Sequence, residues 1–137
     1  MHTLGRHLLI ELYGCPASRL DALDAVREAL AAAVAAVGAS PVGECFHRFA
    51  PQGVSGTVLI AESHLSLHSW PEHGYAAIDV FTCGGLDPRP AIDAFARVLG
   101  AREVRAVEMI RGVPAHLPAG AHLRPEDVVA RTITLAG

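Results

Sequence analysis

One short stretch near the middle of the chain holds most of the side chains that can do chemistry. Residues 62–84 read ESHLSLHSWPEHGYAAIDVFTCG and combine nucleophilic, acidic and proton-transferring groups. Serine and cysteine can attack carbonyl carbons, histidine and cysteine can carry protons, and carboxylates can bind hydroxyl groups or cations. The candidate residues of this stretch are Glu62, Ser63, His64, His68, Glu72, His73 and Cys83.

Two familiar kinds of site fit this stretch poorly. His64 and His68 would share a metal ion on a helix, but Leu65 and Leu67 alternate with polar residues as in a strand. A strand separates the two histidines by about 13 Å, so no bound metal is expected. A hydrolytic Ser/His/Asp site needs Ser63 and His68 in contact, whereas a strand holds them roughly 16 Å apart on opposite faces. The plain alternative is a polar hairpin whose histidines are solvated.

Composition limits the size of the fold and the kinds of partner. The chain has 137 residues, which suits a single domain over residues 1–137. Its 14 acidic and 11 basic residues give a formal net charge of −3, and no basic run could follow a phosphate backbone. The longest apolar stretch, residues 29–39, is too short to span a bilayer, and Glu11 interrupts the apolar N-terminal run. We expect a cytoplasmic protein that binds neither nucleic acid nor membrane.

The cysteines and the absence of lysine narrow the chemistry further. Cys15, Cys45 and Cys83 are odd in number and show no Cys-x-x-Cys spacing, so neither a disulfide framework nor a zinc clip is expected. The chain contains no lysine, the residue that holds pyridoxal phosphate and forms imines with carbonyl substrates. Imine chemistry would therefore need a carbonyl group from another source.

Hydrophobic periodicity predicts the elements that position these side chains, in the order β-α-β-β-β-α-β. The central hairpin favours antiparallel pairing, so we expect an α+β fold. It is a two-layer α/β sandwich with a mainly antiparallel sheet and two helices on one face. The tail beyond Gly112 reads as packing or linker. The predicted elements are a strand over 6–13, a helix from an approximate capping box at Ser18 and Asp21 to Gly38, a short strand through 45–49, a long hairpin of 55–70 and 75–83, a helix over 90–99 and a strand over 102–110.

The hairpin register predicts which side chains meet. If Glu72, His73 and Gly74 form the turn, the residue numbers of each facing pair add up to 146. Ser63 then lies directly opposite Cys83. Their Cβ atoms would then be about 4.5–5.5 Å apart. A slip of one residue would keep the two close along the strands, although it would change the shared face.

Three segments together resemble a known family. GVSGTVLIAESHLSLHSWPEHGYAAIDVFTCG, with LGRHLLIE and FHRF upstream, is similar to the short prokaryotic form of S-adenosylmethionine decarboxylase, a pyruvoyl-dependent enzyme family of polyamine (spermidine) synthesis. The resemblance extends from Leu4 to about Gly112. The departures are Ser69, where the family usually has Thr, His73, where it usually has Tyr, and the tail.

The resemblance implies that the chain is a proenzyme that cuts itself between Glu62 and Ser63. The products would be residues 1–62, the β chain, and residues 63–137, the α chain. The Ser63 hydroxyl attacks the Glu62 carbonyl to form an ester, and β-elimination leaves a dehydroalanine that hydrolyses to a pyruvoyl group. This group forms a Schiff base with the substrate amine and serves as the electron sink, so neither pyridoxal phosphate nor a metal is needed.

Roles follow from the same resemblance. Ser63 is the pyruvoyl precursor, Ser55 and His68 assist processing, and Cys83 donates the proton that completes decarboxylation. A thiol with a pKa near 8.5 is mostly protonated at neutral pH, which suits a donor. The substrate-binding residues would be Phe49, stacking on adenine, Glu72, binding the ribose hydroxyls, and Glu11, near the sulfonium cation.

The separation of His68 from Ser63 and the resemblance together predict a homodimer of processed α/β protomers. Ser55 and His68 of one subunit would meet Ser63 and Cys83 of the other across a two-fold interface.

Two alternatives to S-adenosylmethionine decarboxylation stay open. One is a pyruvoyl enzyme on the same scaffold that decarboxylates arginine or ornithine. The other is an inactive regulatory partner that keeps the fold without the reaction.

Overall fold

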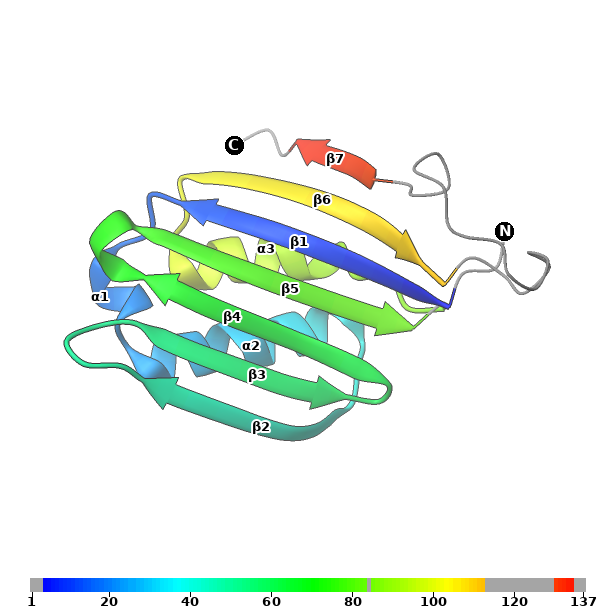
Figure 1. Cartoon of the computed structure of the whole chain (residues 1–137), viewed down its shortest axis with the longest axis horizontal. Coiled ribbons are helices and arrows are strands. Elements are labelled where there is room, and N and C mark those ends of the chain that lie inside the picture. The colour runs from blue at the N-terminus through cyan, green and yellow to red at the C-terminus, as the bar shows by residue number, and fades with distance from the viewer. Residues whose placement is uncertain (1–3, 84, 113–129, 135–137) are drawn as a thin grey trace, which may run out of the picture.

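One antiparallel sheet, covered by helices on one face, makes up the part of the chain that this computed structural model describes, residues 4–83, 85–112 and 130–134 (Figure 1). The elements are β1 (Gly5–Tyr13), α1 (Ala17–Leu20), α2 (Leu23–Val37), β2 (Pro41–Arg48), β3 (Val54–Ile60), β4 (Ser63–Trp70), η1 (Pro71–His73), β5 (Tyr75–Cys83), α3 (Pro90–Leu99), β6 (Glu103–Arg111) and β7 (Ala130–Thr134). The strand order is β2-β3-β4-β5-β1-β6-β7, and every neighbouring pair runs antiparallel. The predicted α+β sandwich is confirmed.

The hydrophobic core lies between the sheet and the helices α2 and α3. Along β3, β4 and β5 buried side chains alternate with more exposed ones, because successive residues of a strand point to opposite faces. The other face, which carries Glu11, Ser66, His68 and their alternating neighbours, is called the open face below. The largest fully buried side chains include Leu8, Ile10, Leu12, Leu30, Leu65, Leu67, Phe95 and Leu99.

The first long helix begins later than predicted. Residues 17–20 form the separate short helix α1, and α2 starts without a side-chain cap. The capping box predicted from Ser18 and Asp21 is wrong, because Asp21 is the C-terminal cap of α1 and its carboxylate accepts the Gly53 N–H instead. The helix end is as predicted, at Gly38, whose φ of 74° lies in the left-handed region that glycine favours.

The predicted long strand over 55–70 is two strands. The chain reverses at Ala61 and Glu62, so β3 pairs with β4 and Ser63 is the first residue after a tight turn. Neither alanine nor glutamate favours turns in the way that Gly, Pro, Asn and Asp do. The sequence therefore carried no local signal for this reversal.

The β4–β5 hairpin is shifted by one residue from the predicted register. Trp70 pairs with Tyr75 and His64 with Phe81, so paired positions sum to 145 instead of 146. The connection is the 3-10 turn η1 followed by Gly74 in the left-handed conformation, one residue longer than the predicted turn. The prediction that Ser63 lies directly opposite Cys83 is wrong by one position, although both stay at the same end of the hairpin.

The remaining elements differ little from the prediction. The helix α3 has the predicted bounds, β6 is displaced by one residue, and β2 begins at Pro41, before the predicted 45–49. Within the tail predicted as packing or linker, residues 130–134 form the strand β7 and pack beside β6. The tail residues 113–129 and 135–137 lie outside the described ranges. Among the described helices, none has the length and apolar character needed to cross a membrane.

Candidate functional site

The first group of predicted site residues lies at the turn between β3 and β4. Glu62 is the second residue of the turn, Ser63 opens β4, and Cys83 ends the neighbouring strand β5. The Cys83 thiol donates a hydrogen bond to the Glu62 main-chain oxygen at an Sγ···O distance of 2.8 Å. That oxygen belongs to the peptide bond predicted to be cut. The shifted register thus brings the thiol to the Glu62 carbonyl and keeps it close to Ser63.

The surroundings of Cys83 keep its thiol protonated. Desolvation, the negative charge of the Glu62 carboxylate and the hydrogen bond to Glu62 all raise the pKa of the Cys83 thiol. The carboxylate oxygen Oε2 of Glu62 lies 3.8 Å from the sulfur, which is why its charge acts on the thiol. A raised pKa favours the protonated form at neutral pH, so the group is suited to donate a proton.

The second group of predicted residues lies at the other end of β3 and β4. Ser55 and His68 face each other across the two strands, and Ser55 Oγ lies 2.7 Å from His68 Nδ1, at hydrogen-bonding distance. Phe49 and Glu72 line the same pocket of about 450 Å³. Phe49 is 47% exposed and therefore presents much of its ring to a ligand. The remaining lining residues are Pro51, Gln52, Gly53, Ser69 and Trp70.

Glu11 lies in the same cross-strand row of the open face. Ala77 on β5 pairs with His68 on one side and with Glu11 on the other, so a small side chain separates the imidazole from the carboxylate. The Tyr75 hydroxyl donates a hydrogen bond to the Glu11 carboxylate. Burial, followed by this hydrogen bond and the charge of Glu11, raises the pKa of Tyr75. The tyrosine therefore holds the predicted sulfonium-binding carboxylate in place.

The two groups are separated along β4 within one chain. Because β4 is a regular strand from Ser63 to Trp70, the five residues from Ser63 to His68 span about 16 Å. Leu65, Leu67 and Ser69 are buried on the helix side, and His68 is exposed on the open face. The structure therefore brings Ser55, His68, Phe49 and Glu72 together and leaves Glu62, Ser63 and Cys83 as a distinct group.

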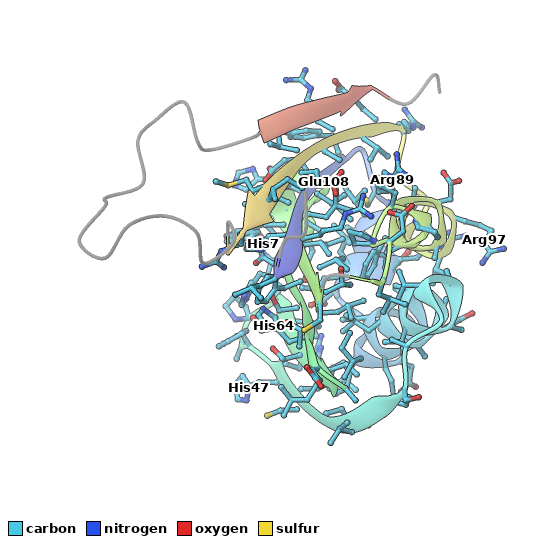
Figure 2. All side chains as sticks on the ribbon, turned by 90° about the vertical axis from the view of Figure 1, so that its right-hand side faces the viewer. His7, His47, His64, Arg89, Arg97 and Glu108 are labelled. Carbon is cyan, nitrogen blue, oxygen red and sulfur yellow. The ribbon has the colours of Figure 1, made fainter. Side chains whose placement is uncertain are left out.

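Several polar residues of the open face were not among the predicted site residues. His47 pairs with Ser55 and its ring contacts Phe49 edge-on, with ring centroids 4.5 Å apart. His7 Nε2 lies 3.1 Å from Asp79 Oδ1, between the two groups of predicted residues. Figure 2 shows His7, His47 and His64 on the side of the sheet turned away from the helices. Alternation along each strand was the signal that could have placed them on this face.

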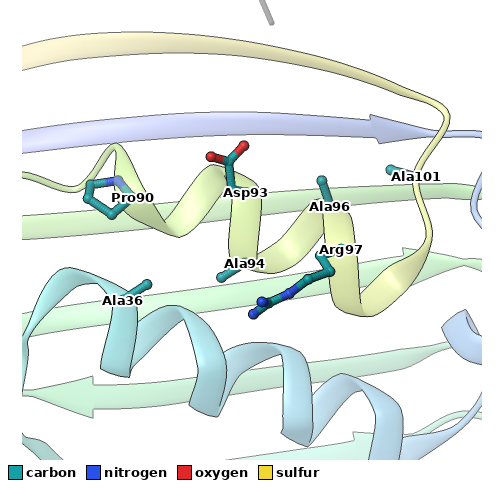
Figure 3. A pocket seen from close by; sticks show the side chains of 7 residues that line it. All are labelled: Ala36, Pro90, Asp93, Ala94, Ala96, Arg97 and Ala101. Carbon is teal, nitrogen blue, oxygen red and sulfur yellow. The ribbon is translucent and has the colours of Figure 1, made fainter. Parts of the chain in front are cut away.

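A second hollow of about 500 Å³ lies between α2 and α3 on the helix side of the sheet (Figure 3). Alanine methyl groups, Pro90, Asp93 and Arg97 line it, and none of the predicted site residues is among them. The described side chains also contain no group of three His, Cys, Asp or Glu residues placed to hold a metal ion. The predicted site residues lie instead at the two ends of β4.

Comparisons with known proteins agree on one family. The family model for S-adenosylmethionine decarboxylase matches residues 6–112. The chain is 49% identical to the S-adenosylmethionine decarboxylase proenzyme of Geobacillus kaustophilus over 82% of this chain and 91% of that protein. The corresponding proenzyme of Anoxybacillus flavithermus is also 49% identical, over 82% of this chain and 91% of its own length.

A solved structure of the same family also has a similar fold. The crystal structure of the adenosylmethionine decarboxylase from Aquifex aeolicus superposes with a TM-score of 0.77 at 36% identity. It covers 85% of this chain and 97% of its own chain. Sequence and fold therefore agree over the stretch that contains both groups of predicted residues. The chain belongs to the S-adenosylmethionine decarboxylase family.

Proposed function

We propose that the chain cuts itself between Glu62 and Ser63 and then decarboxylates S-adenosylmethionine, acting as a carboxy-lyase. The observation that carries this proposal is the Cys83 thiol, placed 2.8 Å from the carbonyl oxygen of the bond to be cut. A thiol at this position can serve twice. It polarises the carbonyl during self-cleavage, and in the mature enzyme it can return a proton to the substrate carbon.

Self-cleavage is supported by the local geometry of the turn. The Ser63 hydroxyl is adjacent in the chain to the Glu62 carbonyl that it would attack, and negative charge would develop on the Glu62 oxygen. A hydrogen-bond donor aimed at that oxygen stabilises such charge. The Cys83 thiol is a donor of this kind, although a weaker one than an N–H group.

The product of cleavage would compensate for the absence of lysine. A pyruvoyl group derived from Ser63 would supply the carbonyl with which the substrate amine condenses. The chain's own residues would do the rest: Cys83 donates the proton, and Ser55 fixes the orientation of the His68 ring through Nδ1. The contact leaves Nε2 of the imidazole to assist the processing of Ser63.

The pocket at the far end of β3 and β4 fits the nucleoside part of the substrate. Phe49 offers an exposed aromatic face for adenine, and Glu72 offers carboxylate oxygens for the ribose hydroxyls. Glu11, held by Tyr75, places a negative charge on the same row of the open face for the sulfonium cation. An arginine or ornithine substrate has neither an adenine ring nor ribose hydroxyls to occupy these two contacts.

We propose a homodimer in which two open faces meet. A two-fold axis lying between the faces, across the middle of β4, would place the His68 end of one protomer over the β3–β4 turn of its partner. Ser63 would be reached there because it is the first residue after the turn, although its position in the alternation is that of the helix side. Leu59 on this face is 53% exposed and Trp70 is 41% exposed, and a partner subunit would cover both. Each active site would then combine Ser55 and His68 of one protomer with Ser63 and Cys83 of the other.

The remaining expectations fit this assignment. Cys15, Cys45 and Cys83 are all free thiols, which suits the reducing environment of the cytoplasm, where we expect the protein to act in polyamine synthesis. Every relative described above is named as a decarboxylase of S-adenosylmethionine or as its proenzyme, and no observation favours arginine, ornithine or an inactive regulatory partner.

The substrate assignment predicts a specific pair of defects. Phe49→Ala and Glu72→Gln should each raise the KM for S-adenosylmethionine by about tenfold, because each removes one contact worth about 1–1.5 kcal/mol to the nucleoside. Self-cleavage should proceed as in the wild type, since neither residue lies at the Glu62–Ser63 turn. Release of labelled CO₂ measures turnover, and a denaturing gel measures cleavage.

Matched controls separate these contacts from general surface effects. Val42→Ala and Glu28→Gln change an exposed apolar and an exposed acidic side chain outside the pocket, so the KM should not move. Arginine and ornithine should release little labelled CO₂. Release from either amino acid, with none from S-adenosylmethionine, would transfer the assignment to the free amino acid.

A further inference from the structure

The loop between β2 and β3, residues 49–53, forms one wall of the 450 Å³ pocket and is held by a carboxylate that does not line it. Asp21, at the end of α1, accepts the Gly53 N–H on Oδ1 at 3.0 Å and the Arg48 Nη2 on Oδ2 at 2.9 Å. Its main-chain oxygen accepts Arg48 Nε at 3.1 Å. One residue therefore binds both ends of the loop that carries Phe49.

Further contacts close the same loop. The Phe49 N–H donates to the Gly53 oxygen at 2.8 Å, and a Cβ added at Gly53, where φ is 103°, would lie 3.3 Å from the Ser69 oxygen. The Ser69 hydroxyl accepts the Val54 N–H at 2.9 Å and donates to the Leu20 oxygen at 2.7 Å. The end of α1 is thus fastened to the loop and to the two strands that carry Ser55 and His68.

Asp21 is charged under working conditions. The hydrogen bond from the Gly53 N–H, together with the hydrogen bond and charge of Arg48, lowers the pKa of the Asp21 carboxyl below its ordinary range. A carboxylate that is ionised at neutral pH keeps both of its acceptor oxygens available. The loop is therefore held by charge-assisted contacts whose loss can be tested with single substitutions.

We propose that Asp21 is a positioning residue for substrate binding, which fixes loop 49–53 and so keeps the Phe49 ring in the pocket that Glu72 also lines. The residue acts through Phe49 and does not touch the ligand. The proposal rests on the proposed function, because it assumes that this pocket takes the adenosine part of the substrate. Asp21 should consequently govern ligand affinity and leave both self-cleavage and the chemical step unaffected.

The only tryptophan of the chain provides a probe that does not depend on turnover. Trp70 lines the pocket, so its fluorescence can report the binding of 5′-methylthioadenosine, a thioether of adenosine without the amino-acid part. In Asp21→Ala the loop should adopt the binding conformation only part of the time. If that fraction falls to a tenth, the Kd rises about tenfold. The kcat at saturating S-adenosylmethionine should stay at the wild-type value.

A double-mutant cycle separates positioning from general destabilisation. In a Phe49→Ala background, Asp21→Ala should change the Kd much less than it does alone, because its effect passes through Phe49. Arg48→Gln should shift the Kd in the same direction by a smaller factor. Asp24→Ala, which removes an exposed carboxylate at the start of α2, should leave it unchanged.

The outcomes distinguish this proposal from the function on which it rests. If the wild-type protein neither binds 5′-methylthioadenosine nor turns over S-adenosylmethionine, the proposed function fails. If the wild type does both and Asp21→Ala, melting like the wild type, keeps its Kd, the positioning role is wrong. Should Asp21→Ala fail to fold, Arg48→Gln decides the question, and an unchanged Kd in that variant overturns the proposal.

Discussion

Replacing Cys83 with Ala is expected to separate self-cleavage from decarboxylation. The thiol donates to the Glu62 oxygen in the uncleaved chain, so its loss should slow cleavage without abolishing it, because Ser63 still supplies the attacking hydroxyl. If Cys83 is the proton donor that we propose, decarboxylation should depend on the thiol more strongly. Losing a general acid typically slows a reaction by about 10²–10⁴-fold. Fragment yield and CO₂ release, measured on one preparation, should therefore diverge.

The pKa of Cys83 adds a pH dependence to this prediction. In the uncut chain, desolvation, the Glu62 charge and the Glu62 hydrogen bond raise that pKa. Cleavage would add the negative charge of a new carboxyl terminus at Glu62, so the protonated form should also persist to higher pH in the cut enzyme than for an ordinary thiol. Turnover should stay level through neutral pH and fall only above about 8.5, the ordinary thiol value. Cys45→Ala removes an exposed thiol elsewhere and should have no effect. Full turnover in Cys83→Ala would show that this thiol has a structural role.

Mixed dimers should rescue a chain that cannot process alone. His68→Ala, expressed by itself, should remain uncut, since the imidazole is missing from both protomers. Co-expressed with Ser63→Ala, the His68→Ala chain keeps an intact Ser63 and should be cut with the help of the partner's His68. The reason is distance, because about 16 Å of β4 separates Ser63 from His68 within one chain. Different affinity tags on the two chains would identify the cut one.

One outcome of the co-expression experiment would contradict the two-chain active site. Heterodimers that form without any cutting of the His68→Ala chain, while isolated wild-type monomers process normally, would place His68 in its own chain's site. The two-chain arrangement would then be wrong. Co-expressing His68→Ala with a second His68→Ala chain of different tag is the control, because no partner there supplies the imidazole.

Regular alternation makes most of the sheet predictable. Leu65 and Leu67 alternate with polar residues, and this period of two is enough to assign their faces and to separate His68 from Ser63. The helix α3 is equally clear, with Pro90 at its start and Gly100 in the left-handed conformation at its end. These features depend on local sequence, which is why they could be predicted.

The predictions that were wrong concern features that depend on contacts between distant segments. The reversal at Ala61 and Glu62 has no turn-forming residue, and it is set by the pairing of β3 with β4. Asp21 was predicted to cap a helix because of its spacing from Ser18, yet its carboxylate binds Gly53 in a loop much later in the chain. The contact of Cys83 with the Glu62 oxygen likewise follows from a register that residue patterning defines only to within one position.

Self-cleavage at Ser63 is tested most directly by an intact-mass spectrum of purified wild-type protein beside Ser63→Ala. The wild type should give two fragments, residues 1–62 and residues 63–137, with the second lighter by one ammonia than its plain sequence. Borohydride should reduce its blocked N-terminus, and Ser63→Ala should remain one uncut chain. A wild-type protein that stays intact after prolonged incubation, with no reducible carbonyl, would contradict both self-cleavage and the proposed pyruvoyl group.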